Sequence, residues 1–408
     1  MNLLTTMRRI GAALLMACGV AVAASAVPPM SQPPIRHVFV IVLENKDFVQ
    51  TFGPDSPAPY LSKSLTRQGV LLTQYFGTAH YSLGNYLAMI SGQGGTPEIR
   101  DDCETFSDFV GSGTTADGQA IGHGCVYPAS VRTLPEQLEA LHKSWGGYME
   151  DLGNDPAREA ASCGAPPLNG ADRTQSAQAP SAAVPKGDQY AARHNPFVYF
   201  HSLIDTPACR DHVVNLERLA SDLKQLATTP EFVFISPNLC HDGHDAPCKN
   251  GEPGGLKSID AFLKTWVPRI MASAAYQRDG LLIVTFDEGD VEEVKLPDGR
   301  IKMEFEGESC CAQQPGPNLG VFPQTQSDSS YLVTLRSFGG DRTGAVLLSP
   351  LLAPGTVSAT PFNHYSLLKS LEDLYGVGAH LGYAGQPGLV GFFEPGSDLR
   401  RRAPIKVR

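Results

Sequence analysis

The sequence contains no apolar run after residue 26 that approaches the length of a membrane span, for which about 20 residues are needed. It also lacks an excess of positive charge, because 32 lysines and arginines face 42 aspartates and glutamates, giving a formal net charge of −10. An acidic chain binds nucleic acid and anionic membranes poorly by charge alone. We therefore expect neither a transmembrane segment nor a nucleic-acid partner. A site for any anionic ligand must rely on local cations or a metal ion.

The first 26 residues are typical of an export signal. Arg8 and Arg9 form a positive start, residues 10–23 are apolar, and Ala24-Ser25-Ala26 matches a cleavage site. We expect residues 1–26 to be a signal peptide and residues 27–408 to form one domain that is periplasmic or secreted. Cys18 leaves lipoprotein anchoring as an alternative, since the residues before it loosely resemble a lipoprotein box.

Cysteine pairing is the expected consequence of export. The sequence has 9 cysteines, and the loss of Cys18 with the signal leaves an even number, as disulfides in an oxidising compartment require. The local pairs Cys103–Cys125 and Cys240–Cys248 are the easiest to close. A zinc site built from Cys240, Cys248 and the histidines between them is the alternative.

The hydrophobic pattern alternates between strands and helices along most of the chain. His37–Leu43 is a continuous apolar run rich in β-branched residues, which suits a strand buried on both faces. Further strands are expected at 70–73, 145–149, 197–200, 232–235, 281–286 and 345–348, and helices at 60–68, 82–91, 134–143, 213–226, 259–276 and 364–375. This alternation predicts an α/β fold with a mostly parallel central sheet and helices on both faces. We expect residues 155–188 to be an inserted loop tethered by Cys163, and residues 289–330 to be an inserted hairpin and loop.

Polar residues collect where the predicted strands end. Glu44 and Asn45 follow the strand at 37–43, and Asp287 and Glu288 follow the strand at 281–286. Asp242 and His244 come shortly after 232–235, and Asn363-His364 opens the last helix, whereas His194-Asn195 precedes its strand. Ligands of open parallel sheets bind beyond the carboxyl ends of the strands. Each residue alone is consistent with a helix cap or a turn, but together they suit a divalent cation held by oxygen and nitrogen.

Ser82 is the candidate nucleophile. It lies in GTAHYSLGNYLAMISG, where a loop becomes a helix. A helix N-terminus offers free N–H groups and a positive dipole end, which suit a phosphate. The alternative is that Ser82 only caps its helix. Beside a metal ion, its hydroxyl would ionise more readily and attack a phosphate ester.

Six segments in this order resemble the bacterial phosphoesterase family: HVFVIVLEN, AHYSLGNYLAMISG, YAARHNPFVYF, FISPNLCHDGHD, LLIVTFDEGD and NHYSLLKSLEDLYG. That family contains secreted acid phosphatases and phosphatidylcholine-type phospholipases C on an alkaline-phosphatase-like fold. The resemblance covers residues 36–377 in motif order, though not the loops. Tyr81 and Gly84 stand where prolines are expected, and His241 stands where Asn or Asp is more usual. These departures bear on the substrate.

The resemblance implies a role for each of these residues. Ser82 would be the nucleophile, with His194 and His244 as further catalytic residues, and Asn85 and Asn195 would contact the phosphate. A divalent metal cation would be the cofactor, and its expected ligands are Glu44, Asn45, Asp242, Asp287, Glu288 and His364. The partner would be a small phosphate-ester substrate or a phospholipid headgroup.

The implied function is a secreted, metal-dependent phosphomonoesterase of the acid phosphatase type, with phosphoinositides among its candidate substrates. A phospholipase C is less expected, because the chain shows neither the extra β-domains of the larger phospholipases nor a basic amphipathic segment. A metal-free serine hydrolase would use Ser82, Asp287 and His364 in that order, but His80 replaces the first glycine of its motif and Glu44 would have no role. A sulfatase motif is absent after Ser82, and a non-catalytic binding protein would not need the polar rim.

Overall fold

The computed structural model describes residues 33–399, so the expected signal peptide and Cys18 lie outside the described residues. Eight strands form the central sheet in the order β15-β2-β14-β9-β1-β8-β6-β7. Neighbouring strands are parallel, except that β14 is antiparallel to both of its neighbours. The expected α/β fold with a mostly parallel sheet is confirmed. The strands are β15 (Thr356–Ser358), β2 (Val70–Leu72), β14 (Ala345–Leu348), β9 (Gly280–Phe286), β1 (His37–Leu43), β8 (Phe232–Ser236), β6 (Trp145–Met149) and β7 (Val213–Asn215).

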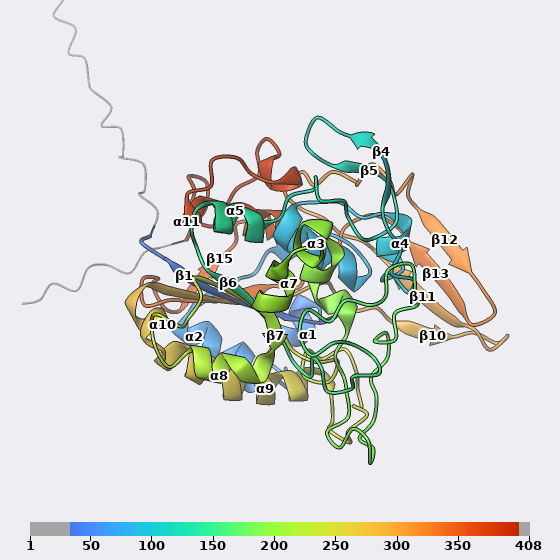
Figure 1. The fold of residues 1–408 in the computed structure, drawn as a ribbon, viewed down its shortest axis with the longest axis horizontal. Coiled ribbons are helices and arrows are strands. Elements are labelled where there is room, and N and C mark those ends of the chain that lie inside the picture. The colour runs from blue at the N-terminus through green and yellow to red at the C-terminus, as the bar shows by residue number, and fades with distance from the viewer. Residues whose placement is uncertain (1–32, 400–408) are drawn as a thin grey trace, which may run out of the picture. The chain divides into compact units, whose positions relative to one another are not determined.

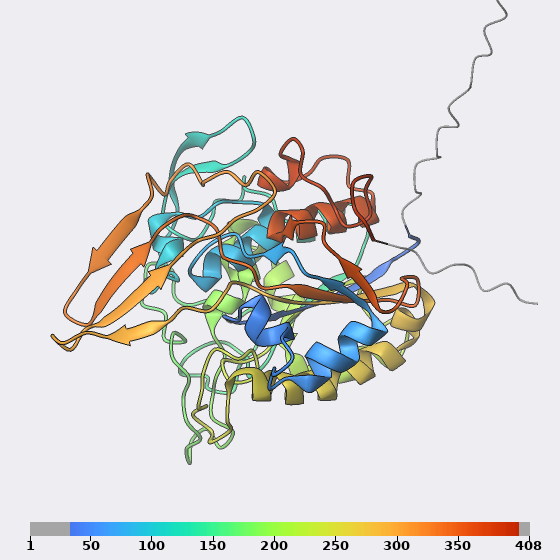
Figure 2. The same ribbon diagram turned by 180° about the vertical axis from the view of Figure 1, so that it is seen from behind.

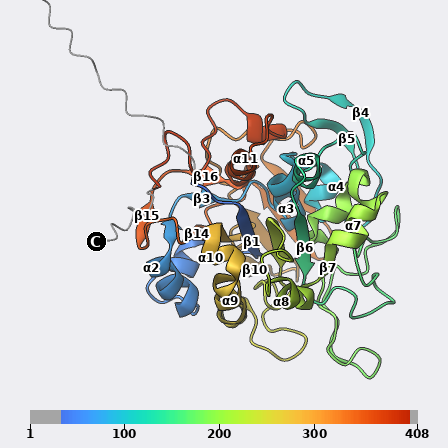
Figure 3. The same ribbon diagram turned by 60° about the vertical axis from the view of Figure 1, so that its left-hand side comes forward.

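Helices cover both faces of this sheet (Figures 1 and 3). All seven residues of β1 are buried, and alternate residues point into two different cores. Val38 and Val40 pack with one set of helices, whereas Phe39 and Ile41 pack with the other. The first set is α3 (Ser82–Ser91), α5 (Leu134–Ala140) and α11 (His364–Tyr375); the second is η1 (Tyr60–Leu65), α8 (Leu219–Asp222), α9 (Gly255–Ala272) and α10 (Ala274–Asp279).

Two expected elements are wrong. Residues 197–200 form no strand, because η3 (Pro196–Tyr199) is a 3-10 helix that starts at a proline. A short apolar run does not by itself distinguish a strand from a buried turn of helix. Residues 213–226 are not one helix, since they begin as β7, which pairs with β6 at the sheet edge, and continue as η4 (Leu216–Arg218) and α8. The remaining short helices are α1 (Phe48–Phe52), α2 (Thr66–Gln68), α4 (Pro97–Arg100), α6 (His201–Ile204), α7 (Pro207–His212), η2 (Ala192–His194) and η5 (Gly382–Gly385).

Small sheets lie outside the central one. β3 (Tyr75–Phe76) pairs with β16 (Phe362–Asn363), and β4 (Val110–Thr114) forms a hairpin with β5 (Ala120–His123). Where loops with one hairpin are expected at 289–330, the structure has a four-stranded sheet in the order β10-β11-β13-β12. Figure 2 shows this small sheet, in orange, projecting from the body of the α/β layers. Its strands are β10 (Glu293–Lys295), β11 (Ile301–Phe305), β12 (Gln324–Ser327) and β13 (Tyr331–Leu335).

The other insertion is irregular, as expected. No helix or strand occurs within residues 155–188, all of which the structure describes, and the disulfide Cys163–Cys209 ties this segment to α7. The pairs Cys103–Cys125 and Cys240–Cys248 are also disulfides, as is Cys310–Cys311. Cys240 and Cys248 are therefore bonded to each other and not arranged as zinc ligands. None of the helices between residues 33 and 399 is both long and apolar enough to cross a membrane.

Candidate active site

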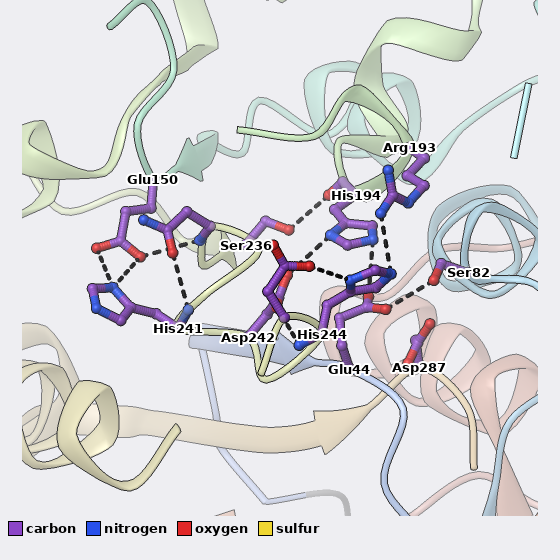
Figure 4. Close-up of polar contacts among 12 residues, drawn as sticks. Glu44, Ser82, Glu150, Arg193, His194, Ser236, His241, Asp242, His244 and Asp287 are labelled. Carbon is purple, nitrogen blue, oxygen red and sulfur yellow. Dashed lines mark hydrogen bonds and ion pairs between the residues drawn. The ribbon is translucent and has the colours of Figure 1, made fainter. Parts of the chain in front are cut away.

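The carboxyl ends of three adjacent strands bring the predicted polar residues together. Glu44 directly follows β1, Asp287 directly follows β9, and Asp242 lies on the loop after β8. The backbone fixes their approach, since Glu44 N donates to the Asp242 carbonyl at 2.9 Å. Asn45 N donates to Asp287 Oδ1 at 3.1 Å. Residues far apart in the sequence thus share one edge of the sheet (Figure 4).

Ser82 lies against this edge at the first position of α3. The N-cap residue of the helix is Tyr81, so Ser82 does not serve as the cap. Its hydroxyl instead donates to Glu44 Oε2 at 2.8 Å. One helical turn later, the Tyr86 hydroxyl donates to Glu44 Oε1 at 2.7 Å. Residues four apart share a helix face, and both side chains of this face hold the same buried carboxylate.

His194 completes the cluster. Its ring stacks on Tyr86 at 5.1 Å, and Nδ1 lies 3.1 Å from Asp242 Oδ2. Burial lowers the pKa of His194 well below its usual value, and Arg193 and His244 lower it further. A neutral ring that donates from Nδ1 to Asp242 has a lone pair on Nε2. Among the described residues Nε2 has no hydrogen-bond partner, and it lies 3.4 Å from Glu44 Oε1.

The cluster has an excess of buried negative charge. Burial raises the pKa of Glu44 well above its usual value, and Asp287 and Asp242 raise it further. Burial likewise raises the pKa values of Asp242 and Asp287. Buried carboxylates are costly unless a cation or hydrogen bonds compensate them, and Asp287 Oδ2 has no hydrogen-bond partner within residues 33–399.

A divalent cation fits this donor set. One ligand atom from each of Glu44, His194 and Asp242 lies within 4.8 Å of the others. The unpartnered atoms, Asp287 Oδ2 and His194 Nε2, belong to the same cluster. Carboxylate oxygen and imidazole nitrogen together suit cations of the zinc, iron or manganese type. A cation would remove the repulsion between the His194 lone pair and the Glu44 carboxylate.

A cleft of about 860 Å³ opens above Ser82, and Asn45, Arg193, His244 and Glu288 line its floor. Arg193 is a buried cation in this floor, and its Nη2 donates to His244 Nε2 at 3.2 Å. Because arginine only donates, His244 accepts there, and its other nitrogen, Nδ1, lies 2.9 Å from Asp245 Oδ1. Burial lowers the pKa of His244, in line with a neutral ring.

The N-terminus of α3 is partly occupied by the protein itself. Asp102 Oδ1 accepts the N–H of Leu83 at 2.9 Å, and the Arg193 Nε atom lies 3.7 Å from Asp102 Oδ2. Burial raises the pKa of Asp102 to about 6, even though Arg193 lowers it. The expectation that free N–H groups of this helix hold the phosphate is therefore not met at Leu83. Arg193 is the cationic side chain on the cleft floor that could bind a phosphate in place of these N–H groups.

The two expected phosphate-binding amides lie elsewhere. Asn85 Oδ1 accepts from the N–H groups of Thr78 and Ala79, and its Nδ2 donates to the carbonyls of Ala79 and Tyr81. It therefore shapes the turn before Ser82. Asn195 Nδ2 donates to the Cys163 carbonyl and to the Tyr190 hydroxyl. The Nδ2 donors of both amides are therefore already engaged within the protein, whereas Oδ1 of Asn195 has no partner among the described residues.

Two expected metal ligands are also engaged elsewhere. His364 Nε2 donates to the backbone carbonyl of Asp287 at 2.6 Å, and Nδ1 lies 3.0 Å from the Tyr75 hydroxyl. Burial lowers the pKa of His364 to about 4, so the ring is neutral and both of its nitrogens are used. Glu288 pairs with His80, whose Nε2 lies 2.8 Å from Asp341 Oδ2. Burial would lower the pKa of His80, but its two carboxylate neighbours raise it to about 10.

His241 lies beside the cluster and not within it. Its Nδ1 lies 2.9 Å from both oxygens of Glu150, and Nε2 lies 3.1 Å from Glu252 Oε2. Figure 4 shows the pair His241 and Glu150 apart from Ser82 and Glu44. His241, which stands where Asn or Asp is more usual, therefore pairs with Glu150 and Glu252 beside the cluster.

Comparison with known sequences identifies the family of the chain. The profile of the Phosphoesterase family matches residues 54–378. The chain belongs to this family. It is 30% identical over 253 residues to a phosphate-repressible acid phosphatase from Penicillium chrysogenum, covering 61% of this chain but 47% of that relative. It is 25% identical over 365 residues to a phosphatidylinositol-3-phosphatase from Mycobacterium tuberculosis, covering 90% of this chain and 83% of the relative.

Among solved structures, the fold is similar to a protein of the alkaline phosphatase superfamily from Vibrio parahaemolyticus. The TM-score is 0.46 at 12% identity, over 88% of this chain and 71% of the other. The match to the Penicillium phosphatase spans about half of that relative's length.

Three residues of the cleft and cluster are missing from the sequence-based set. The spacing of Tyr86, four residues after Ser82, could have identified it as a neighbour on the same helix face. Arg193 directly precedes His194, but nothing in the local pattern distinguishes a buried arginine from an exposed one. Asp102 lies in a loop and carries no signal of its contact with Leu83.

Proposed function

We propose that this protein is a metal-dependent phosphoric monoester hydrolase of the acid phosphatase type, with Ser82 as its nucleophile. The observation that carries this proposal is the hydrogen bond of 2.8 Å from the Ser82 hydroxyl to Glu44, at the floor of an 860 Å³ cleft. Family membership and relatives named as phosphatases support the same chemistry.

The Glu44 carboxylate, Asp287 Oδ2 and His194 Nε2 would hold the cation. Asn45 would add its amide oxygen from the cleft floor. Asp242, although it lies within the same group of donor atoms, would orient His194 and not bind the cation itself, since its Oδ2 faces Nδ1 of the ring and its Oδ1 accepts the N–H of His244. Ligand histidines commonly donate their second N–H to a carboxylate in this way. When bound, the cation supplies positive charge that stabilises the serine alkoxide and the phosphoryl oxygens. His364 would position Asp287 through its backbone carbonyl and not act as a ligand.

The reaction would proceed in two displacements at phosphorus. In the first, Ser82 Oγ loses its proton, forms a bond to phosphorus, and the bond to the leaving alcohol breaks, with a proton reaching the departing oxygen. In the second, water attacks phosphorus, the Oγ–P bond breaks, and Ser82 regains its proton as inorganic phosphate leaves. Arg193 would bind the phosphoryl oxygens and in doing so release Nε2 of His244. His244, which lines the cleft, would then transfer protons through Nε2 to and from the leaving oxygen and water.

The substrate class and location extend this proposal. Relatives named as acid phosphatase and phosphatidylinositol-3-phosphatase support monoesters, and make phosphoinositides one substrate class to test. The four disulfides support export to an oxidising compartment.

The decisive assay compares p-nitrophenyl phosphate with p-nitrophenyl phosphorylcholine, before and after exhaustive chelation. We expect a higher kcat/KM for the monoester, and loss of hydrolysis on chelation with recovery when metal is restored. Preferred hydrolysis of the phosphorylcholine ester would assign a phospholipase C-type diesterase instead. Undiminished activity in a preparation shown to be metal-free would favour a serine hydrolase.

A further inference from the structure

The inserted four-stranded sheet forms one wall of the cleft, and its two middle strands, β11 and β13, present apolar side chains there. Met303 and Phe305 on β11, and Tyr331 and Val333 on β13, line the cavity that also contains Ser82. The ring of Phe305 lies 5.7 Å from that of Tyr81, the residue directly before Ser82. Phe305 and Val333 are buried in a small cluster with Met303 and Tyr81 packed against them. A leaving group attached to a phosphate at Ser82 would therefore lie against aromatic and aliphatic side chains.

The entrance of the same cleft is acidic. Five carboxylate residues of the lining are exposed, namely Asp101, Glu104, Asp290, Glu293 and Asp328. The cationic residues among the lining are Lys46 and Arg193. Arg193 belongs to the buried floor, and Lys46 Nζ donates to the Asn45 carbonyl at 2.7 Å. The mouth of the cleft therefore carries a negative field that its own cations do not neutralise.

We infer that the inserted sheet and the acidic mouth select monoesters by the charge of the leaving group. They favour an apolar or aromatic group that is cationic or neutral, and disfavour one that carries further negative charge. This inference rests on the proposed phosphatase function. The phosphate being cleaved is bound on the floor by Arg193 and the metal cluster, so the mouth acts on the rest of the substrate. Phosphoinositides, the substrate class that the mycobacterial relative suggests testing, have a leaving group that retains a phosphodiester charge, and they would be poor substrates.

The test uses three aryl phosphates that differ in charge at the far end of one side chain: the phosphate monoesters of tyramine, tyrosol and p-hydroxyphenylpropionate. Their phenol leaving groups are of closely similar reactivity, so differences report recognition. We expect kcat/KM to fall from the cationic to the neutral to the anionic ester by roughly three- to tenfold per step at low salt. The differences should lie mainly in KM and shrink at about 0.5 M NaCl, where surface charges are screened.

A triple variant tests whether the acidic residues at the mouth cause this order of kcat/KM. Asp101, Glu104 and Glu293 accept no side-chain hydrogen bond from another residue within the described part of the chain, so Asp101→Asn, Glu104→Gln and Glu293→Gln together should fold normally. This variant should hydrolyse the three esters with similar kcat/KM values. The matched control neutralises Asp55, Asp211 and Glu217, which are exposed and do not line the cleft, and should leave the order intact.

The apolar wall has its own variant. Tyr331→Ala removes a side chain that is 42% exposed, and should raise KM for the aryl esters more than for glycerol phosphate. Hydrolysis of all three aryl esters at equal rates, or fastest hydrolysis of the anionic one, would overturn charge selection while leaving the phosphatase proposal intact. Failure to hydrolyse any phosphate monoester, with metal supplied, would instead overturn the proposed function.

Discussion

The carboxylate of Glu44 accepts a hydrogen bond from the Ser82 hydroxyl at 2.8 Å while its other oxygen is held by Tyr86 at 2.7 Å. The serine is thus connected to the end of β1 through a side chain that is itself fixed from the next helical turn. Catalytic groups need such supporting contacts, because a displacement of about 1 Å is costly. The first prediction concerns this support.

Tyr86→Phe removes the hydroxyl that holds Glu44 but retains the ring that stacks on His194. We expect kcat to fall by about tenfold, because a hydrogen bond to a charged group is lost, with little change in the fold. The matched control is Tyr127→Phe, which deletes another buried hydroxyl, bonded to the Gly94 carbonyl at 3.0 Å. It should change stability by a similar amount and leave kcat unaltered. Equal kcat effects in the two variants would show that Tyr86 has no special role.

Metal removal should destabilise the wild type more than Asp287→Asn. Chelation leaves the buried carboxylates of Glu44 and Asp287 without a compensating cation, so the wild type should lose thermal stability as well as activity. Asp287→Asn should bind less metal by elemental analysis, have a lower kcat, and be destabilised less by chelation. The exposed Asp211→Asn serves as the control and should behave as the wild type. Identical metal contents in Asp287→Asn and wild type would exclude Asp287 from the site.

The pH dependence of stability should report the ionisation of Glu372 in α11, which is not part of the metal cluster. Burial raises its pKa from the ordinary 4.5 to about 7, although Gln137 and the Leu381 N–H lower it. A raised carboxyl pKa gives a stability contribution that is fully present below pH 4.5 and lost as pH rises through about 7. Glu372→Gln should therefore have a higher Tm than wild type at pH 8, and no advantage at pH 4.5. The exposed Glu217→Gln is the control, and parallel Tm curves for Glu372→Gln and wild type would contradict the assignment.

The disulfides can be tested by peptide mapping without reduction. The structure pairs Cys240 with Cys248 and Cys163 with Cys209. Replacing both Cys163 and Cys209 by serine should lower stability by about 3–4 kcal/mol, because the bond closes a long loop, and should loosen residues 155–188 to proteolysis. Free thiols at Cys240 and Cys248 together with bound zinc would show that the metal alternative is correct.

The sequence predicted well what depends on local pattern. β1, β6, β14, α3 and α11 have the expected bounds, because each is a strong apolar run or ends at a glycine or turn. The edge that joins Glu44, Asp242 and Asp287 followed from the general rule for parallel sheets.

What the sequence could not show was where individual side chains point. Asn85, Asn195 and His364 have residue types suited to phosphate or metal, but the amide N–H groups of both asparagines and the two ring nitrogens of His364 already have partners within the protein. The four-stranded insertion was missed because its strands are short and mostly polar, and only their packing on residues such as Phe305 gives them a core.

The last prediction concerns Ser82 itself. Ser82→Ala should fold, bind metal and have a kcat lower by several orders of magnitude, because it removes the attacking oxygen. The control is Ser91→Ala at the other end of α3, where the hydroxyl donates to the Leu87 carbonyl at 2.7 Å. It should keep the wild-type kcat at a modest cost in stability. Wild type, but not Ser82→Ala, should yield a phosphorylated Ser82 peptide after rapid acid quench.

The competing mechanism is direct attack by water, with Ser82 serving only to position Glu44. In that case loss of one hydrogen bond to the carboxylate should cost about as much as Tyr86→Phe, which removes the bond to the other oxygen of the same group. The two variants therefore separate the mechanisms by magnitude. A Ser82→Ala enzyme with a kcat similar to that of Tyr86→Phe, and no phosphoserine in the wild type, would exclude a covalent intermediate. A kcat far below that of Tyr86→Phe, with metal content unchanged, is the result expected of a nucleophile.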